Sequence, residues 1–93
     1  MREVKKYYGD GQIHQHYWVN EKGQIEGEYK VWYENGQLGS HCFYKNGNID
    51  GEFKSWHENG QLAVHCFYKN GLSESEYKSW HNTGQLAVHC FFK

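Results

Sequence analysis

Hydrophobic and polar residues alternate in short runs along this chain, and most runs are separated by residue pairs that end in glycine. Alternation with a period of two is typical of strands that have one covered and one open face. The pattern predicts an all-β chain, an antiparallel meander of about eight strands with no helix. The predicted strands cover residues 2–8, 12–19, 25–33, 38–45, 49–57, 62–68, 74–81 and 86–92.

One dipeptide, Asn-Gly, recurs between the predicted strands. Between β-rich flanks it is the strongest short-range signal for a two-residue type I′ hairpin turn, in which both central residues have φ > 0. Asp10-Gly11 and Thr83-Gly84 stand at corresponding places. We predict type I′ turns at the four pairs, whose turn-defining residues are Asn35 and Gly36, Asn46 and Gly47, Asn59 and Gly60, and Asn70 and Gly71.

A repeat of 24 residues organises the chain, because residues 51–71 recur almost unchanged on either side. Repeats of this length form one supersecondary unit each and bury their apolar side against their neighbours. We predict a single repeat domain over 1–93, with a degenerate N-terminal unit at 1–26 that has one extra residue, repeats at 27–50 and 51–74, and a truncated repeat at 75–93. The recurring positions are Trp32, Trp56 and Trp80, His41, His65 and His89, and Cys42, Cys66 and Cys90.

The predicted turns fix a strand register in which every tryptophan lies opposite a small residue. Trp56 faces Ala63 in this register, and Trp32 and Trp80 face Gly39 and Ala87. Such large-and-small neighbours across strands stabilise a sheet, and a slip of one residue would separate them. The other predicted pairs are His57 with Leu62, Ser55 with Val64, Lys54 with His65, Phe53 with Cys66, Val31 with Ser40 and Tyr29 with Cys42. The interpretation as a hairpin array depends on this register and on the absence of helix.

Strand alternation then sorts the side chains onto two faces. Spacings between turn glycines alternate between 11 and 13 residues, so a bulge near Gly27 and Gly51 or a shear of the sheet must absorb the difference, and we favour the bulge. The core-like face carries Ile49, Phe53, Ser55, His57, Leu62, Val64, Cys66 and Tyr68, and the other carries Glu52, Lys54, Trp56, Glu58, His65 and Phe67.

The recurring run Gly-Glu-Tyr/Phe-Lys-x-Trp-Tyr/His-Glu-Asn-Gly-Gln-Leu, followed by Phe-Tyr-Lys-Asn-Gly, resembles the variant form of the MORN repeat over roughly residues 9–93. That variant occurs in bacterial proteins often labelled antitoxin-like and in many-copy proteins of giant viruses that infect amoebae. The run His-Cys-Phe-Tyr-Lys-Asn-Gly is most similar to the viral versions. The resemblance implies an elongated, twisted antiparallel sheet of stacked hairpins that serves protein association or scaffolding, and it brings no catalytic residues.

Composition excludes several classes of partner. Aromatic residues make up 18% of the chain, so large rings must provide most of the burial. The net charge is −1, Arg2 is the only arginine, and the lysines are spread out. Nucleic acids and anionic membranes attract clustered Lys and Arg, so we predict neither as a partner. With no apolar run of membrane-spanning length and no secretory signal, we expect a soluble protein.

The cysteines and histidines invite metal or redox chemistry, but their positions argue against both. Equivalent cysteines should lie roughly 9–10 Å apart, too far for a disulfide, so we expect free thiols in a reducing compartment. His65 and Cys66 are neighbours on a strand and point to opposite faces, so they provide neither a converging zinc site nor a nucleophile with its base. His14 and His16 share a face and could chelate weakly, although surface histidines are the simpler interpretation. We predict no metal, cofactor or enzymatic activity.

Two interpretations remain open for the aromatic column formed by Trp32, Phe43, Trp56, Phe67, Trp80 and Phe91: packing within the sheet, or a protein-binding surface. The predicted function is a protein interaction or scaffold module, as a virion or accessory protein of a large virus. The alternatives are an antitoxin-like protein that binds a toxin, and a peripheral phospholipid-binding scaffold. The last strand ends at Phe91-Phe92-Lys93 without a cap, so we expect a protein partner or a second copy to pair with a terminal edge strand. We expect a location in the bacterial or host-cell cytoplasm or in a virion.

Overall fold

The computed structural model describes residues 1–92 and the side chains of residues 1–91, so Lys93 and the side chain of Phe92 lie outside the described part. Nine antiparallel strands and no helix occur in this part, which confirms the predicted fold class. The strands are β1 (Arg2–Tyr7), β2 (Ile13–Val19), β3 (Gly27–Trp32), β4 (Leu38–Lys45), β5 (Asn48–Ile49), β6 (Gly51–Trp56), β7 (Leu62–Lys69), β8 (Leu72–Trp80) and β9 (Leu86–Phe92).

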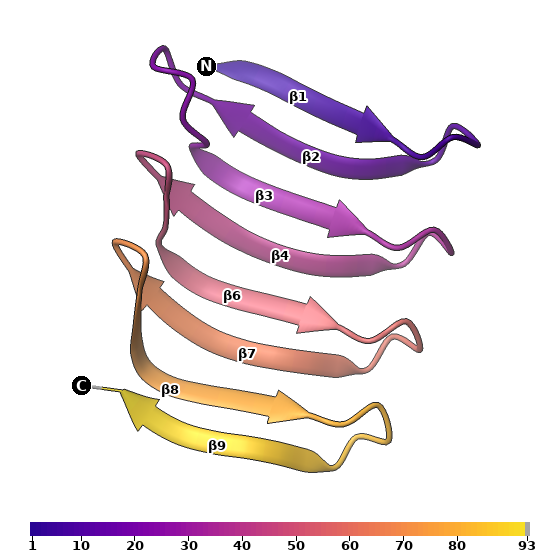
Figure 1. Cartoon of the computed structure of the whole chain (residues 1–93), viewed down its shortest axis with the longest axis vertical. Coiled ribbons are helices and arrows are strands. Elements are labelled where there is room, and N and C mark those ends of the chain that lie inside the picture. The colour runs from indigo at the N-terminus through magenta and orange to yellow at the C-terminus, as the bar shows by residue number, and fades with distance from the viewer. Residues whose placement is uncertain (93) are drawn as a thin grey trace.

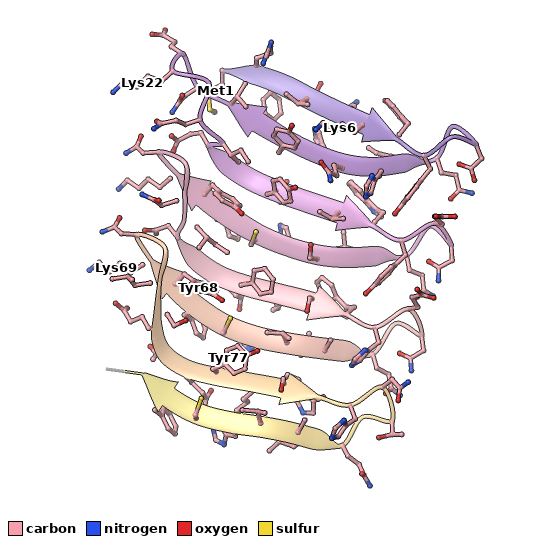
Figure 2. The ribbon with its side chains drawn as sticks, viewed as in Figure 1. Met1, Lys6, Lys22, Tyr68, Lys69 and Tyr77 are labelled. Atoms are coloured by element: carbon pink, nitrogen blue, oxygen red, sulfur yellow. The ribbon has the colours of Figure 1, made fainter. Side chains whose placement is uncertain are left out.

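The strands form one sheet in chain order, with β1 and β9 at its two free edges and the short β5 paired only with β4 (Figure 1). The molecule measures 37 × 35 × 12 Å. The shortest dimension fits a single sheet. Side chains stand on both faces and no second layer covers them (Figure 2). The buried hydrophobic residues of the described part are Val19, Cys42 and Cys66, so the core is small.

The turns after β4 and β7 are the predicted type I′ turns. Asn46 and Gly47 have φ values of 53° and 84°, and Asn70 and Gly71 have 53° and 83°. Both central residues are therefore left-handed, as this turn requires. Figure 1 shows these tight turns on the same side of the sheet as the two chain ends.

The Asn-Gly turns on the opposite side are different, and the prediction of type I′ there was wrong. In the turn from His57 to Gln61, only Gly60 is left-handed, with a φ of 88°. The Gly60 N–H donates to the His57 carbonyl (2.9 Å), and the His57 N–H donates to the Gln61 carbonyl (2.8 Å). This is a three-residue loop, a type I turn followed by a left-handed glycine. Asn35 and Gly36 form the same turn between Tyr33 and Gln37.

Asn59 therefore serves this turn through its side chain and not through a positive φ. Its Oδ1 accepts a hydrogen bond from the Gln61 N–H at 2.9 Å. Asp10, Asn35 and Thr83 provide the same side-chain acceptor in their turns. The sequence shows what these four residues share: a side-chain oxygen two positions before glutamine.

The longer loop changes the pairing of tryptophan. Trp56 lies opposite Leu62 and not opposite Ala63, so the predicted pairs of Trp56 with Ala63 and of His57 with Leu62 were wrong. Since Trp56 pairs with Leu62 and Ser55 pairs with Val64, Ala63 is left without a partner and forms a bulge. The predicted pairs beyond the bulge are confirmed: Ser55 with Val64, Lys54 with His65, Phe53 with Cys66, Val31 with Ser40 and Tyr29 with Cys42. Leu62 consequently shares the face of Trp56, which corrects its assignment to the core-like face.

In the repeat that contains Trp32, the small residue Gly39 accommodates Tyr33, the aromatic residue after the tryptophan. A Cβ added to Gly39 would lie 3.2 Å from the Tyr33 ring and 3.3 Å from the Val31 carbonyl oxygen. Trp32 itself pairs with Leu38, and Trp80 pairs with Leu86, so the predicted pairing of these tryptophans with Gly39 and Ala87 was also wrong. The complementarity of large and small neighbours exists, but it is displaced by one position.

A second bulge confirms the favoured explanation of the uneven glycine spacing. β4 pairs Tyr44 with Ile49 but His41 with Lys54, so two extra residues lie between β5 and β6. Gly51 provides the left-handed backbone there, with a φ of 99°. Ser75 occupies the equivalent position in β8 with a φ of 65°. The extra residue of the N-terminal unit is absorbed elsewhere, because the turn from Asn20 to Gln24 has three residues where later units have two.

Candidate interaction surface

Each of the last three hairpins presents the same set of side chains on one face of the sheet, which we call the tryptophan face. Cross-strand pairs place the members on this face together, because Glu52 lies opposite Phe67 and Lys54 opposite His65. The face comprises Glu28, Lys30, Trp32, His41 and Phe43, then Glu52, Lys54, Trp56, His65 and Phe67, then Glu76, Lys78, Trp80, His89 and Phe91.

All six residues predicted as an interaction column therefore lie on one face. The phenylalanines are its open part: Phe43 is 39% exposed, Phe67 36% and Phe91 71%. The tryptophans are only partly exposed, and Trp56 shares a small hollow with Leu38 of the preceding hairpin. The tryptophans are therefore partly covered within the sheet, and the phenylalanines are more accessible. Whether the column binds a partner stays a prediction.

A row of histidine–glutamate pairs runs beside the phenylalanines. In the central hairpin, His65 Nε2 lies 2.9 Å from a Glu52 carboxylate oxygen. The predicted pair of Lys54 with His65 thus has Glu52 as an additional, hydrogen-bonded neighbour. The equivalent pairs are His41 with Glu28 at 2.9 Å, and His16 with Glu3 and His89 with Glu76 at 2.8 Å each.

These bonds change the acidity of the glutamates. The hydrogen bond from the paired imidazole, with help from a nearby lysine, holds the pKa of Glu28, Glu52 and Glu76 below its usual range. For Glu76 the partners are His89 first and Lys78 after it. The carboxylates of Glu28, Glu52 and Glu76 are therefore charged at neutral pH.

The opposite face, which we call the tyrosine face, contains the best-covered side chains. Cys42 and Cys66 are 2% and 1% exposed. Burial raises the pKa of the Cys42 thiol to about 11 and also raises that of Cys66. Both thiols are therefore neutral near pH 7 and are poor nucleophiles. Aromatic contacts cover them, including Tyr29 with Tyr44 (ring centroids 5.5 Å apart) and Phe53 with Tyr68 (6.0 Å).

A third feature, which the sequence analysis missed, links successive hairpins along the row of three-residue turns. The Tyr8 hydroxyl donates to the Trp32 carbonyl (2.6 Å), and the Tyr33 hydroxyl donates to the Trp56 carbonyl (2.5 Å). His57 Nε2 donates to the Trp80 carbonyl at 2.8 Å. The sequence contained a signal for these bonds, because an aromatic residue with a hydrogen-bond donor directly follows the repeat tryptophan, or Tyr7 in the first unit. These residues are Tyr8, Tyr33 and His57.

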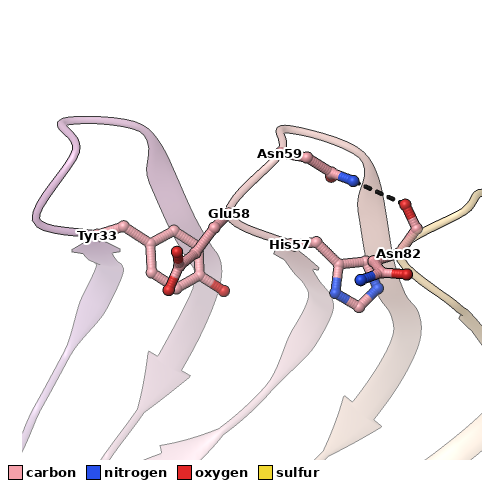
Figure 3. Close-up of a pocket in the computed structure, with 5 residues that line it drawn as sticks. All are labelled: Tyr33, His57, Glu58, Asn59 and Asn82. Carbon is pink, nitrogen blue, oxygen red and sulfur yellow. Dashed lines mark hydrogen bonds between the residues drawn. The ribbon is translucent and has the colours of Figure 1, made fainter.

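The turn asparagines add a parallel set of bonds. Asn35 Nδ2 donates to the Glu58 carbonyl (3.2 Å), and Asn59 Nδ2 donates to the Asn82 carbonyl (2.7 Å). Figure 3 shows the second of these bonds beside a shallow pocket of about 450 Å³ between neighbouring turns. Each of the first three hairpins therefore donates hydrogen bonds to the hairpin that follows it.

The histidines do not assemble a metal site. In the described part of the chain, no group of three His, Cys, Asp or Glu side chains converges in a way that could hold a metal ion. His14 stacks on Tyr8, with ring centroids 4.3 Å apart, while His16 bonds Glu3. The two histidines considered for weak chelation thus have separate partners. Residues 1–92 also contain no helix long and apolar enough to cross a membrane.

Stacked hairpins with one set of side chains per unit define a β-hairpin repeat protein. The family model of the MORN repeat variant matches residues 25–46, 49–70 and 73–93, and the chain belongs to this family. MORN repeats form a non-enzymatic module that generally contacts other proteins or membrane lipids. Comparisons with curated proteins and with solved structures found no match.

Proposed function

We propose that this protein is a non-catalytic protein-binding module and that the tryptophan face is its contact surface. The observation that carries the proposal is the column of exposed phenylalanines, Phe43, Phe67 and Phe91, at one position of successive repeats. Large aromatic side chains on an open surface are enriched at protein interfaces. The paired histidines lie beside these rings, with ring centroids 5.2 Å apart for His41 and Phe43 and 5.3 Å apart for His65 and Phe67.

The charges of this face favour a protein partner over a lipid surface. Each repeat places one glutamate, one lysine and one histidine there, as in Glu52, Lys54 and His65. The charged groups of a repeat therefore nearly cancel at neutral pH. An anionic membrane is attracted by clusters of several Lys or Arg, which this face lacks among the described residues. A partner with apolar side chains and a balanced polar rim fits better.

The test removes the exposed rings without opening the core. We expect Phe43→Ser combined with Phe67→Ser to keep the fold and to lose the partner, because both rings are more than one third exposed. Phe43→Tyr combined with Phe67→Tyr is the matched control, since it keeps both exposed rings and should keep the partner. Affinity capture from the native source, with circular dichroism of each variant, measures both properties. Retention of the same partner by the double variant would contradict the proposal.

Two finer hypotheses rest on the family resemblance alone. In the first, the protein is a structural or accessory protein of a large virus and is located in the virion or the host cytoplasm. In the second, it is an antitoxin-like protein of the bacterial cytoplasm that neutralises a toxin by direct binding. Both cytoplasmic locations suit free cysteines, because both are reducing. A toxin gene next to the coding gene favours the second hypothesis, and detection of the protein in purified virions favours the first.

The phospholipid-binding alternative has a separate test. Flotation with vesicles of phosphatidylcholine and phosphatidylserine should leave the protein in the unbound fraction. Flotation that disappears in the Phe43→Ser and Phe67→Ser variant would instead assign the tryptophan face to lipid.

A further inference from the structure

The two free edges of the sheet, β1 and β9, are complementary to each other. β9 repeats the sequence of β7, and β7 is covered by β8. β8 pairs with β7 at Val64, and the counterpart Val88 on β9 is 47% exposed. Leu86 is 52% exposed, whereas its counterpart Leu62 on β7 is only partly exposed. Within residues 1–92, β9 therefore has the side chains of an interior strand and a paired strand on one side only. A strand of this kind is a template for pairing.

β1 resembles the strands that cover such edges inside the molecule. β3, β6 and β8 carry Glu, Lys and Trp at alternate positions, and β1 carries Glu3, Lys5 and Tyr7. Pairing confirms the equivalence, because Lys5 lies opposite His16 as Lys30 lies opposite His41. Glu3 also bonds His16, as Glu28 bonds His41. β1 thus has the pattern that β4 and β7 accept as their next strand.

The interior contacts between hairpins are short, so β1 is long enough to reproduce one. β2 pairs with β3 directly at two positions, Gln15 with Val31 and His16 with Lys30. β4 pairs with β6 at Ser40 with Ser55 and at His41 with Lys54. The same register between β9 and the β1 strand of another copy places His89 opposite Lys5 and Val88 opposite Lys6.

The turns provide matching donors and acceptors. His57 donates to the carbonyl of Trp80, and the equivalent donor of the last hairpin is His81, which is exposed. The position equivalent to Trp80 in the first hairpin is Tyr7. Thr83 likewise stands where Asn59 donates to the next turn, and its hydroxyl can donate. The last hairpin therefore offers donors, and the first hairpin presents the equivalent carbonyl positions.

From these observations we infer that a second copy of this chain adds to the sheet head to tail, with its β1 pairing antiparallel with β9. Such a contact joins two different surfaces, so it leaves a free β1 on one copy and a free β9 on the other and can continue into longer assemblies. The inference uses the sheet edges and does not depend on the proposed role of the tryptophan face.

Sedimentation velocity over a range of concentrations, with a reductant present, tests the inference. We expect the average mass to rise with concentration beyond that of a dimer. Hydrogen exchange of the same samples should show rising protection at both β1 and β9. A monomer at every concentration, a mass that stops at the dimer, or protection at only one edge would overturn the inference.

Charge substitutions at Val88 make the test specific for the predicted register. Val88→Glu should tighten association about two- to fivefold because Glu would lie opposite Lys6, and Val88→Lys should weaken it by a similar factor. Adding Lys6→Glu to Val88→Lys should restore association. A symmetric contact between two β9 strands predicts instead that both substitutions weaken association, and that result would contradict the head-to-tail arrangement.

Discussion

β7 and β9 contain the same six residues, Leu-Ala-Val-His-Cys-Phe, but have different surroundings. β7 lies between β6 and β8, whereas β9 has only β8 beside it (Figure 1). Phe67 is 36% exposed and its counterpart Phe91 is 71% exposed. Cys66 is buried, while Cys90 is only partly covered. The comparison teaches that burial in this protein is set by the neighbouring hairpin and not by the local sequence, as expected for a repeat array.

A charge at the equivalent cysteines should give the largest difference between the two strands. Cys66→Asp buries a carboxylate without a partner and should cost about 3–5 kcal/mol of the free energy of unfolding. Cys90→Asp leaves the carboxylate near water and should cost about 1 kcal/mol. Urea unfolding followed by tryptophan fluorescence measures both values. Equal losses would show that the free edge does not weaken the environment of Cys90.

The bulges give a second contrast between equivalent positions. Gly51→Ser should cost about 1–3 kcal/mol, because it places a Cβ at a left-handed position. Ser75→Gly should stabilise the protein by about 1 kcal/mol, because it removes the same strain where it already exists. Thermal unfolding of both variants measures the changes. A loss of stability in Ser75→Gly would show that the Ser75 side chain makes a contact that outweighs the strain.

The histidine–glutamate pairs predict a small dependence of stability on pH. The pKa of Glu52 is lower in the folded protein than its ordinary value of 4.5, mainly because of the bond from His65. The bond between Glu52 and His65 therefore stabilises the folded protein fully above the ordinary glutamate pKa of 4.5. This stabilisation is lost as the pH falls through the lower pKa of Glu52 in the folded protein. Because the pair is partly exposed, it should contribute at most about 1 kcal/mol.

Glu52→Gln removes this contribution, so the variant should lose less stability than the wild type as the pH falls below the ordinary glutamate value. Glu76→Gln should change the slope in the same direction, because the pKa of Glu76 is also lowered by its bond from a histidine. Urea unfolding at a series of acidic pH values measures these slopes. Identical slopes for the wild type and Glu52→Gln would contradict the assignment.

The strands and most of their pairing could be predicted from the sequence, because alternation and the repeat are local signals. The turn types could not all be predicted from the dipeptide, since Asn59-Gly60 and Asn70-Gly71 are identical pairs with different backbones. Thr83, which replaces asparagine in the last of these turns, indicated that the turn type differs. A β-branched residue rarely adopts φ > 0, so this position needs a side-chain oxygen and not a left-handed backbone.

The candidate surface was predictable in outline. Alternation placed Trp56 and Phe67 on one face, but it gave no measure of which ring is covered. The exposure of Trp56 depends on Leu38 of the preceding hairpin, which shares a hollow with it. The bonds between turns depend in the same way on contacts between units, such as that from His57 to the Trp80 carbonyl. Contacts between repeats are therefore the part that a sequence pattern describes least.

Hydrogen exchange at low protein concentration tests the central claim most directly, because residues 62–66 and 86–90 have identical sequences and hence similar intrinsic exchange rates. We expect amides in β7 to exchange about tenfold or more slowly than their counterparts in β9. The ratios should be largest at alternate residues, where β9 points its N–H groups away from β8. Equal protection of the two strands would contradict the claim that each hairpin is protected by the one that follows it.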